Sequence, residues 1–122
     1  GFANIQIYDP LTDTWQSSND VGSSLTPLPA GRGGAGKSIF KHGEFYVFGG
    51  ETLDAPGATP QGVYDRVDVY NPATNIWRLE APMPTARHGV FPILFESRVF
   101  LFAGATTSGL GQSSSLEIFT RQ

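Results

Sequence analysis

Cysteine is absent from the 122-residue sequence, and charged residues are scarce. Without cysteine the chain has no disulfide, no thiolate metal site and no cysteine nucleophile. The charged fraction is 16%, against a usual value of about 25%, and the net charge of −3 creates no basic field that would attract nucleic acid. No apolar run approaches the roughly 18 residues of a membrane span. We expect one small domain with one core, no nucleic-acid partner and no membrane span.

Metal-binding and catalytic patterns are also missing. His42 and His88 are the only histidines, and no H-x-x-x-H or EF-hand pattern surrounds them. No nucleophile, base and orienting acid stand at a motif spacing. We therefore expect no metal, no cofactor and no catalytic residue in this chain.

One stretch, GRGGAGKS at 31–38, fits the phosphate-binding pattern G-x-x-x-x-G-K-[ST]. A phosphate loop needs a buried strand before it and a helix after it, so that amide groups and the helix dipole face the anion. Here Pro27 and Pro29 precede the stretch, and IFKHGEFYVFGG follows it with a pattern of strand, turn and strand. We interpret the stretch as a glycine-rich segment leading into a strand, not as a nucleotide site.

Glycine and proline are abundant, with 15 and 9 residues, and they separate short clusters of β-branched and aromatic residues. This composition indicates many short strands joined by turns. The chain also repeats itself: YDPLTDTW at 8–15 matches YNPATNIW at 70–77, and LEIF at 116–119 begins a third copy. A second block, FYVFGG at 45–50, matches VFLFAG at 99–104. The repeating unit is therefore roughly 50 residues long.

Each unit contains four strand-like segments. They lie around 35–40 and 89–95, at 44–49 and 98–103, at 67–70, and around Trp77. The continuous apolar run of the second segment is typical of a strand buried on both faces. The alternation of the third segment indicates one covered face. Along the chain this predicts two strands, then four, then three.

These motifs resemble the kelch repeat, which has an arginine before the first strand, Gly-Gly after the second, and a tyrosine and a tryptophan on either side of a turn. The matching residues are Tyr8, Trp15, Gly49, Gly50, Tyr70, Trp77, Ala103 and Gly104, with Arg32 and Arg87 as the arginines. Ala103 departs from the pattern, because it stands where the family has the first glycine. The resemblance covers essentially the whole chain.

The kelch resemblance implies an all-β fold of four-stranded antiparallel β-propeller blades, here an incomplete propeller. The partial kelch domain at 1–122 would comprise the end of one blade (1–16), a complete blade (32–79) and most of the next (87–122). The glycines would allow neighbouring blades to approach closely, and the tyrosines and tryptophans would fill the wedge between blades. Because two blades expose edges and apolar faces, the remaining blades would come from a longer chain, which we favour, or from other copies.

In kelch adaptor proteins, arginines at the position of Arg32 and Arg87 line the channel mouth and bind acidic groups of a partner. The resemblance therefore makes Arg32, Arg87 and the adjacent His88 candidate ligand-binding residues. The alternatives are that the arginines tie neighbouring loops together through carbonyl groups and that the histidine is inert. Two long polar loops, 51–66 and 104–115, are further candidates, since long rim loops often bind ligands; they could equally be mobile decoration.

Three aspartates follow one another in the first long loop and the strand after it. Asp54, Asp65 and Asp68 could contact calcium or a sugar. We favour the alternative that they are solvated loop residues.

Taken together, the resemblance implies a non-enzymatic interaction module that binds a protein or glycan ligand through its rim loops. An alternative is a segment of a carbohydrate-active propeller enzyme, such as a sugar mutarotase; copper oxidase chemistry of the galactose oxidase type needs a cysteine that this chain lacks. A purely structural scaffold is the third possibility. The low charge and the Ser/Thr/Gly-rich loops are more similar to bacterial kelch proteins, many of them exported, than to cysteine-bearing animal adaptors.

Overall fold

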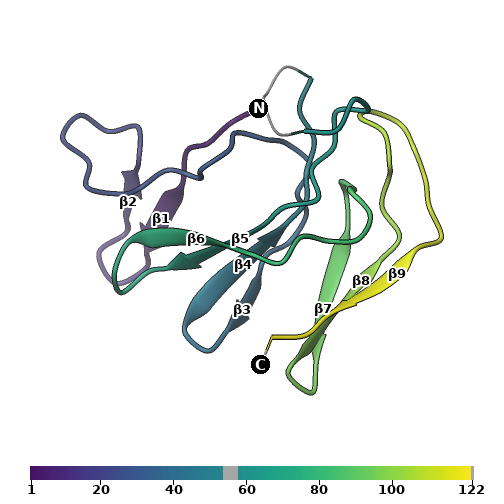
Figure 1. The fold of residues 1–122 in the computed structure, drawn as a ribbon. Coiled ribbons are helices and arrows are strands. Elements are labelled where there is room, and N and C mark those ends of the chain that lie inside the picture. The colour runs from purple at the N-terminus through teal and green to yellow at the C-terminus, as the bar shows by residue number, and fades with distance from the viewer. Residues whose placement is uncertain (54–57, 122) are drawn as a thin grey trace.

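The computed structural model describes residues 1–53 and 58–121. Within these residues nine strands form three antiparallel sheets, and there is no helix that could cross a membrane (Figure 1). The sheets have two, four and three strands in chain order, which confirms the count made from the sequence. Within each sheet, strands that follow one another along the chain pair as antiparallel neighbours, and either a short turn or a longer loop joins them.

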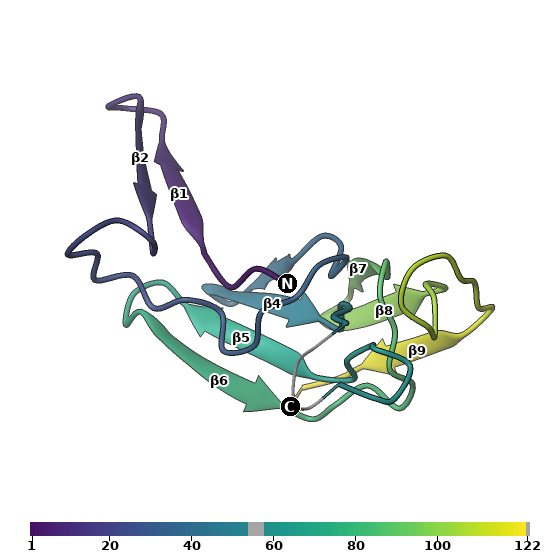
Figure 2. The same ribbon diagram turned by 90° about the horizontal axis from the view of Figure 1, so that it is seen from above.

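The first sheet is the hairpin of β1 (Gln6–Asp9) and β2 (Thr14–Ser17). The second sheet contains β3 (Ile39–Lys41), β4 (Glu44–Phe48), β5 (Val67–Asn71) and β6 (Ile76–Glu80). The third sheet contains β7 (Phe91–Phe95), β8 (Arg98–Phe102) and β9 (Leu116–Phe119). The second and third sheets lie side by side, whereas the β1–β2 hairpin projects away from them (Figure 2).

The segment GRGGAGKS leads directly into a strand. β3 begins one residue after Ser38, so no helix dipole faces the loop. Gly36 has a φ of +80°, and a Cβ there would lie 2.4 Å from the carbonyl oxygen of Val90. These glycines therefore allow the chain to approach the third sheet closely, as expected for a glycine-rich segment before a strand.

The hydrophobic core lies between the second and third sheets. Tyr46 and Phe48 of β4 contact the ring of Phe119 in β9, with centroids 5.9 and 5.6 Å apart. Val99 and Leu101 of β8 complete this layer and are fully buried. The first strands, β3 and β7, lie next to each other, as the inner strands of adjacent propeller blades do.

Burial of the individual strands differs from the sequence-based expectation. β4 was expected to be buried on both faces, yet Phe45 and Val47 face a cleft and are not fully buried. β5 was expected to have one covered face, yet its first four residues are all buried. The reason is that the polar position of β5, Asp68, is held in an internal ion pair. Alternation of polar and apolar residues therefore did not mark an exposed face here.

The glycine pair at the end of β4 brings the two sheets together, as predicted. The amide of Gly50 donates a hydrogen bond of 3.0 Å to the carbonyl of Arg87. A Cβ on Gly49, whose φ is +60°, would lie 2.1 Å from that same carbonyl oxygen. Ala103 has nearly the same φ, +53°, at the corresponding place after β8. The two repeats therefore have nearly the same backbone conformation at this position, although the second repeat has an alanine where the first has a glycine.

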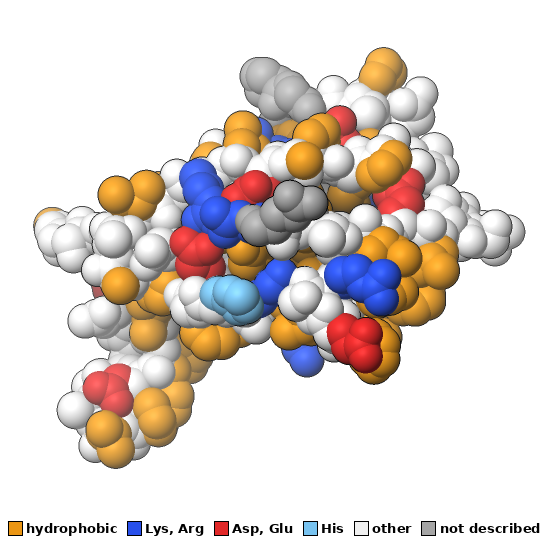
Figure 3. Space-filling model, turned by 60° about the horizontal axis from the view of Figure 1, so that its bottom comes forward, with side chains coloured by type: hydrophobic (Ala, Val, Ile, Leu, Met, Phe, Trp, Pro, Cys, Tyr) orange, Lys and Arg blue, Asp and Glu red, His pale blue; other side chains and the backbone are white. Residues whose placement is uncertain are grey.

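Hydrophobic side chains remain exposed at both ends of this row of sheets. In Figure 3 they appear on the arm at the lower left, which is the β1–β2 hairpin, and on the right, over the third sheet. On the hairpin the predicted wedge residue Trp15 is 66% exposed. Its counterpart Trp77 is instead half-buried, lines a cleft together with residues of β1, and donates a hydrogen bond of 3.0 Å to the carbonyl of Thr26.

Candidate functional site

The guanidinium group of Arg32 points into the protein. It donates to the carboxylate of Asp68 and, at 3.0 Å, to the carbonyl of Gly49, and it stacks over the ring of Tyr64. Arg66 donates two further bonds to Asp68, at 2.8 and 2.7 Å. Asp68 is therefore a fully buried carboxylate between two arginines.

The electrostatics of this triad favour the ionised carboxylate. Burial raises the pKa of Asp68, but the hydrogen bonds and charges of Arg66 and Arg32 outweigh it and hold the pKa below its usual range. Burial lowers the pKa of Arg32, which is still a strong base at neutral pH.

Arg87 repeats this arrangement in the third sheet. Its side chain is 0% exposed and donates to the carboxylate of Glu117, at 2.8 Å, and to the carbonyl of Ala103. In the repeat, Arg87, Glu117 and Ala103 correspond to Arg32, Asp68 and Gly49. Each motif arginine thus joins the loop before its first strand to the third strand of the same sheet. This geometry favours the structural tie over ligand contact for both arginines.

The three aspartates do not form a site. Asp68 is buried in the triad, so both the solvated-loop reading and the calcium or sugar reading are wrong for it. Asp65 is exposed, and Asp54 lies outside the described residues. Among the residues that the structure describes, no three His, Cys, Asp or Glu side chains cluster as metal ligands would.

Residues from both long loops meet at one end of the molecule. We name this group the rim cluster: Glu51, Gln61, His88, Ser108 and Gly109. Glu51 accepts hydrogen bonds from the Ser108 hydroxyl, at 2.8 Å, and from the Gly109 amide, at 2.7 Å. The amide of Ser108 donates to the carbonyl of Gln61 at 2.8 Å. Hydrogen bonds therefore join the described parts of the two loops.

His88 joins the rim cluster and so is not an unpartnered loop histidine. Its Nε2 lies 2.9 Å from the carbonyl oxygen of Thr107 and 3.7 Å from the Glu51 carboxylate. The Gly109 amide, followed by the Ser108 hydroxyl, lowers the pKa of Glu51, so this end of the molecule carries a negative charge. The sequence pointed to His88 but gave no signal for Glu51 or Ser108.

A small cavity of about 240 Å³ adjoins the rim cluster at His88. Gly104, Gln112 and Ser113 line it together with backbone groups. The hydroxyl of Ser113 is buried and has no hydrogen-bond partner in the described structure. Gln112 and His88 therefore offer an amide and an imidazole to a polar group in the cavity, whereas the Ser113 hydroxyl is shielded from solvent.

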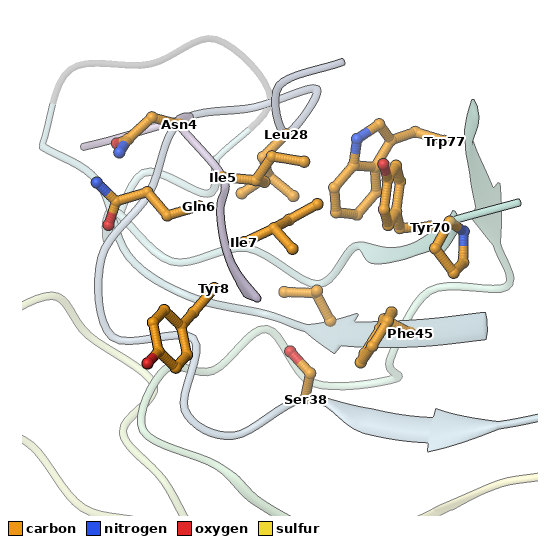
Figure 4. Close-up of a pocket in the computed structure, with 12 residues that line it drawn as sticks. Asn4, Ile5, Gln6, Ile7, Tyr8, Leu28, Ser38, Phe45, Tyr70 and Trp77 are labelled. Carbon is orange, nitrogen blue, oxygen red and sulfur yellow. The ribbon is translucent and has the colours of Figure 1, made fainter. Parts of the chain in front are cut away.

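A larger cleft, about 530 Å³, separates the β1 segment from the second sheet. Figure 4 shows Ile5, Ile7 and Leu28 pointing toward Tyr70 and Trp77. This cleft is mostly apolar, although Asn4, Gln6 and Ser38 also line it, and its lining includes the aromatic pair of the repeat. It is the joint between the first and second sheets, so the rim cluster with its small cavity is the better candidate for ligand binding.

The fold and the motif geometry define blades of a β-propeller: a complete four-stranded sheet flanked by two incomplete ones, with glycines and aromatic residues at the joints. The chain belongs to the kelch-repeat family and forms an incomplete propeller. It is 30% identical over 114 residues to Kelch-like protein 40 of Mus musculus and 29% identical over 102 residues to Kelch-like protein 23 of Homo sapiens, covering 93% and 84% of this chain. The chain spans 16% of the length of each of these relatives.

Two further similarities involve Escherichia coli N-acetylneuraminate epimerase and a solved structure. The chain is 35% identical to the epimerase over 79 residues, which are 62% of this chain and 21% of the enzyme. The solved structure of YjhT superposes with a TM-score of 0.58 and 26% identity, covering 77% of this chain and 25% of that one. No family model matches the sequence.

Proposed function

We propose that this segment is part of a non-enzymatic propeller module that binds a protein ligand through the rim cluster. The supporting observation is that Glu51, in the described part of loop 51–66, is hydrogen-bonded to Ser108 and Gly109 of loop 104–115 and lies 3.7 Å from His88. Side chains that are already hydrogen-bonded to one another lose less conformational entropy when a partner binds than free side chains do. The similarity to Kelch-like proteins supports this class of function over a purely structural scaffold.

In this proposal the motif arginines act indirectly. The hydrogen bonds of Arg32 and Arg87 position the loops that precede the first strands. The ligand contacts His88, the Glu51 carboxylate and the polar side chains of the small cavity. The carboxylate selects for basic or hydrogen-bond-donating groups on the partner. This differs from capture of acidic groups by the arginines, which their burial disfavours.

An array of immobilised peptides, including lysine-rich and glutamate-rich series, tests this proposal. We expect binding to the lysine-rich series, weakened roughly tenfold by His88→Ala or Glu51→Gln. His42→Ala is the matched control, because His42 lies in the β3–β4 turn, away from the rim cluster. If the rim variants bind every peptide as the unchanged chain does, the proposal is refuted.

A second candidate is a segment of a carbohydrate-active propeller, with a glycan as ligand. The specific observation in its favour is the 35% identity to the epimerase of Escherichia coli. In that case Gln112 and His88 would bind sugar hydroxyl groups in the small cavity. Exchange between the anomers of N-acetylneuraminate, followed by NMR, tests it; a rate equal to that in buffer rejects the enzymatic reading for this chain.

A further inference from the structure

A cavity of about 270 Å³ lies where the second and third sheets meet, and its lining is mostly basic. Lys41, His42, Tyr46 and Arg121 line it, and we name it the basic cavity. The β3–β4 turn, which contains His42, lies at the opposite end of the molecule from the loop between β8 and β9 (Figure 1). The basic cavity is therefore separate from the rim cluster.

Lys41 is a buried lysine without a counter-ion. It is 8% exposed, and its ammonium group donates to the carbonyl of Ser97 in the β7–β8 turn. Among the described residues no carboxylate forms an ion pair with it. Its cross-strand neighbour Glu44 instead accepts bonds of 2.6 and 2.8 Å from Arg78. Because a buried charge is costly unless it is paired, an anion in the cavity would stabilise this ammonium group.

The repeat does not require a charge at this position. Lys41 pairs with Glu44 across the β3–β4 turn, and Phe95 pairs with Arg98 across the β7–β8 turn. Phe95 is therefore the counterpart of Lys41, so an apolar side chain can end the first strand of a sheet equally well. This comparison indicates that Lys41 has a role other than packing.

Tyr46 supplies a second donor to the basic cavity. It is 1% exposed, and its hydroxyl accepts a hydrogen bond of 3.1 Å from Arg121. A phenol hydroxyl both accepts and donates, so its own hydrogen remains available to a ligand. His42 lines the same cavity and is exposed, so its imidazole can be reached from solvent.

The arginines at this end of the molecule already have carboxylate partners. Arg121 lies 3.4 Å from Glu44 and 3.3 Å from Glu80, and Arg78 pairs with the same two carboxylates. These two cations and two anions balance, which leaves the charge of Lys41 in excess. A planar carboxylate is bound best by a free guanidinium fork, whereas lysine binds a phosphate group as a point charge.

We propose that the basic cavity binds a phosphate group. The Lys41 ammonium and the Tyr46 hydroxyl donate to phosphate oxygens, and the His42 imidazole contacts the group from the solvent side. The ligand is either inorganic phosphate or a small phosphate ester, since the two share this chemistry. The site does not depend on the function proposed for the rim cluster.

The test is a titration of the chain with inorganic phosphate at constant ionic strength, followed by the NMR signals of the His42 and Gly43 amides in the β3–β4 turn. We expect saturable shifts of both signals. Lys41→Met should weaken binding about tenfold or more, because it removes a charged donor, and Tyr46→Phe should weaken it about fivefold. Lys37→Met is the matched control, because Lys37 is exposed and does not line the cavity, and it should leave binding unchanged.

Two further measurements keep the outcome unambiguous. Tyr46→Phe removes a single oxygen atom, so it tests the site even if Lys41→Met does not fold. Titration with glucose 6-phosphate identifies the source of the phosphate group: tighter binding than that of inorganic phosphate indicates an ester, weaker binding indicates the free ion, and glucose itself should not bind. The absence of saturable shifts, or a loss of affinity in Lys37→Met equal to that in the cavity variants, overturns the proposal.

Discussion

Replacing Asp68 with asparagine should destabilise the fold more than any other single loss of charge in the second sheet. The carboxylate is 0% exposed and the Arg32 side chain 1% exposed, so the substitution leaves a buried guanidinium without its counter-ion. Removing one partner of a buried pair costs about 3–5 kcal/mol. Arg66 adds less to this loss because its side chain is 22% exposed and water can replace its bonds.

Urea unfolding followed by tryptophan fluorescence measures this cost. With a slope of about 1–3 kcal/mol per molar for a small domain, a loss of about 3 kcal/mol moves the midpoint by about 1 M or more. The matched control is Glu44→Gln, which breaks a partly exposed ion pair with Arg78 and should cost less than about 1 kcal/mol.

A double variant, Arg32→Met with Asp68→Asn, separates the buried charge from other effects of the substitution. Since no unpaired buried guanidinium remains at position 32, the double variant should be more stable than Asp68→Asn alone, even if that single variant does not fold. Equal midpoints for Asp68→Asn and Glu44→Gln would refute the reasoning. A double variant less stable than Asp68→Asn would refute it as well.

Three further predictions follow from the same contacts. The pKa of Asp68 lies below its ordinary value of 3.8, so its stabilisation is present above that pH and is lost as the pH falls through the folded-state pKa. The difference between the urea midpoints of the unchanged chain and Asp68→Asn should therefore shrink as the pH is lowered below 3.8, and a constant difference would contradict this. Gly49→Ala should lower the free energy of unfolding by at least about 2 kcal/mol, because the added Cβ would clash with the Arg87 carbonyl. Gly22→Ala, with a φ of +78° and open space around it, should lower it by only about 1 kcal/mol. Equal melting temperatures for the two variants would be evidence against the contact. Glu51→Gln should speed hydrogen exchange at the Gly109 amide roughly fivefold, as expected for loss of about 1 kcal/mol, and unchanged exchange measured by NMR would argue against a tied rim.

Much of the architecture could be predicted because it depends on local patterns. The turn between Tyr70 and Trp77 is encoded by Asn71 and Pro72, whose chemistry acts within a few residues, and the structure has the two strands pair across it in that register. The repeat of this pattern predicted the division into sheets of two, four and three strands.

The candidate site was predicted only in part. His88 and the two long loops were identified, and the structure brings them together. Glu51 and Ser108 were missed because neither belongs to a repeated motif, and their contact joins residues 57 positions apart. For the arginines, the sequence left ligand contact and a structural tie as alternatives, and their inward orientation favours the tie.

By itself, the sequence determined the repeat, the strand order and the positions of the turns, since each depends on residues that are neighbours along the chain. Only the tertiary structure decided which faces are buried and which charges are paired. The carboxylate partners of the motif arginines lie 36 and 30 residues away, on the third strand of each sheet. Asp68 has the pattern of a solvent-facing strand residue, and it is buried because folding places two guanidinium groups beside it.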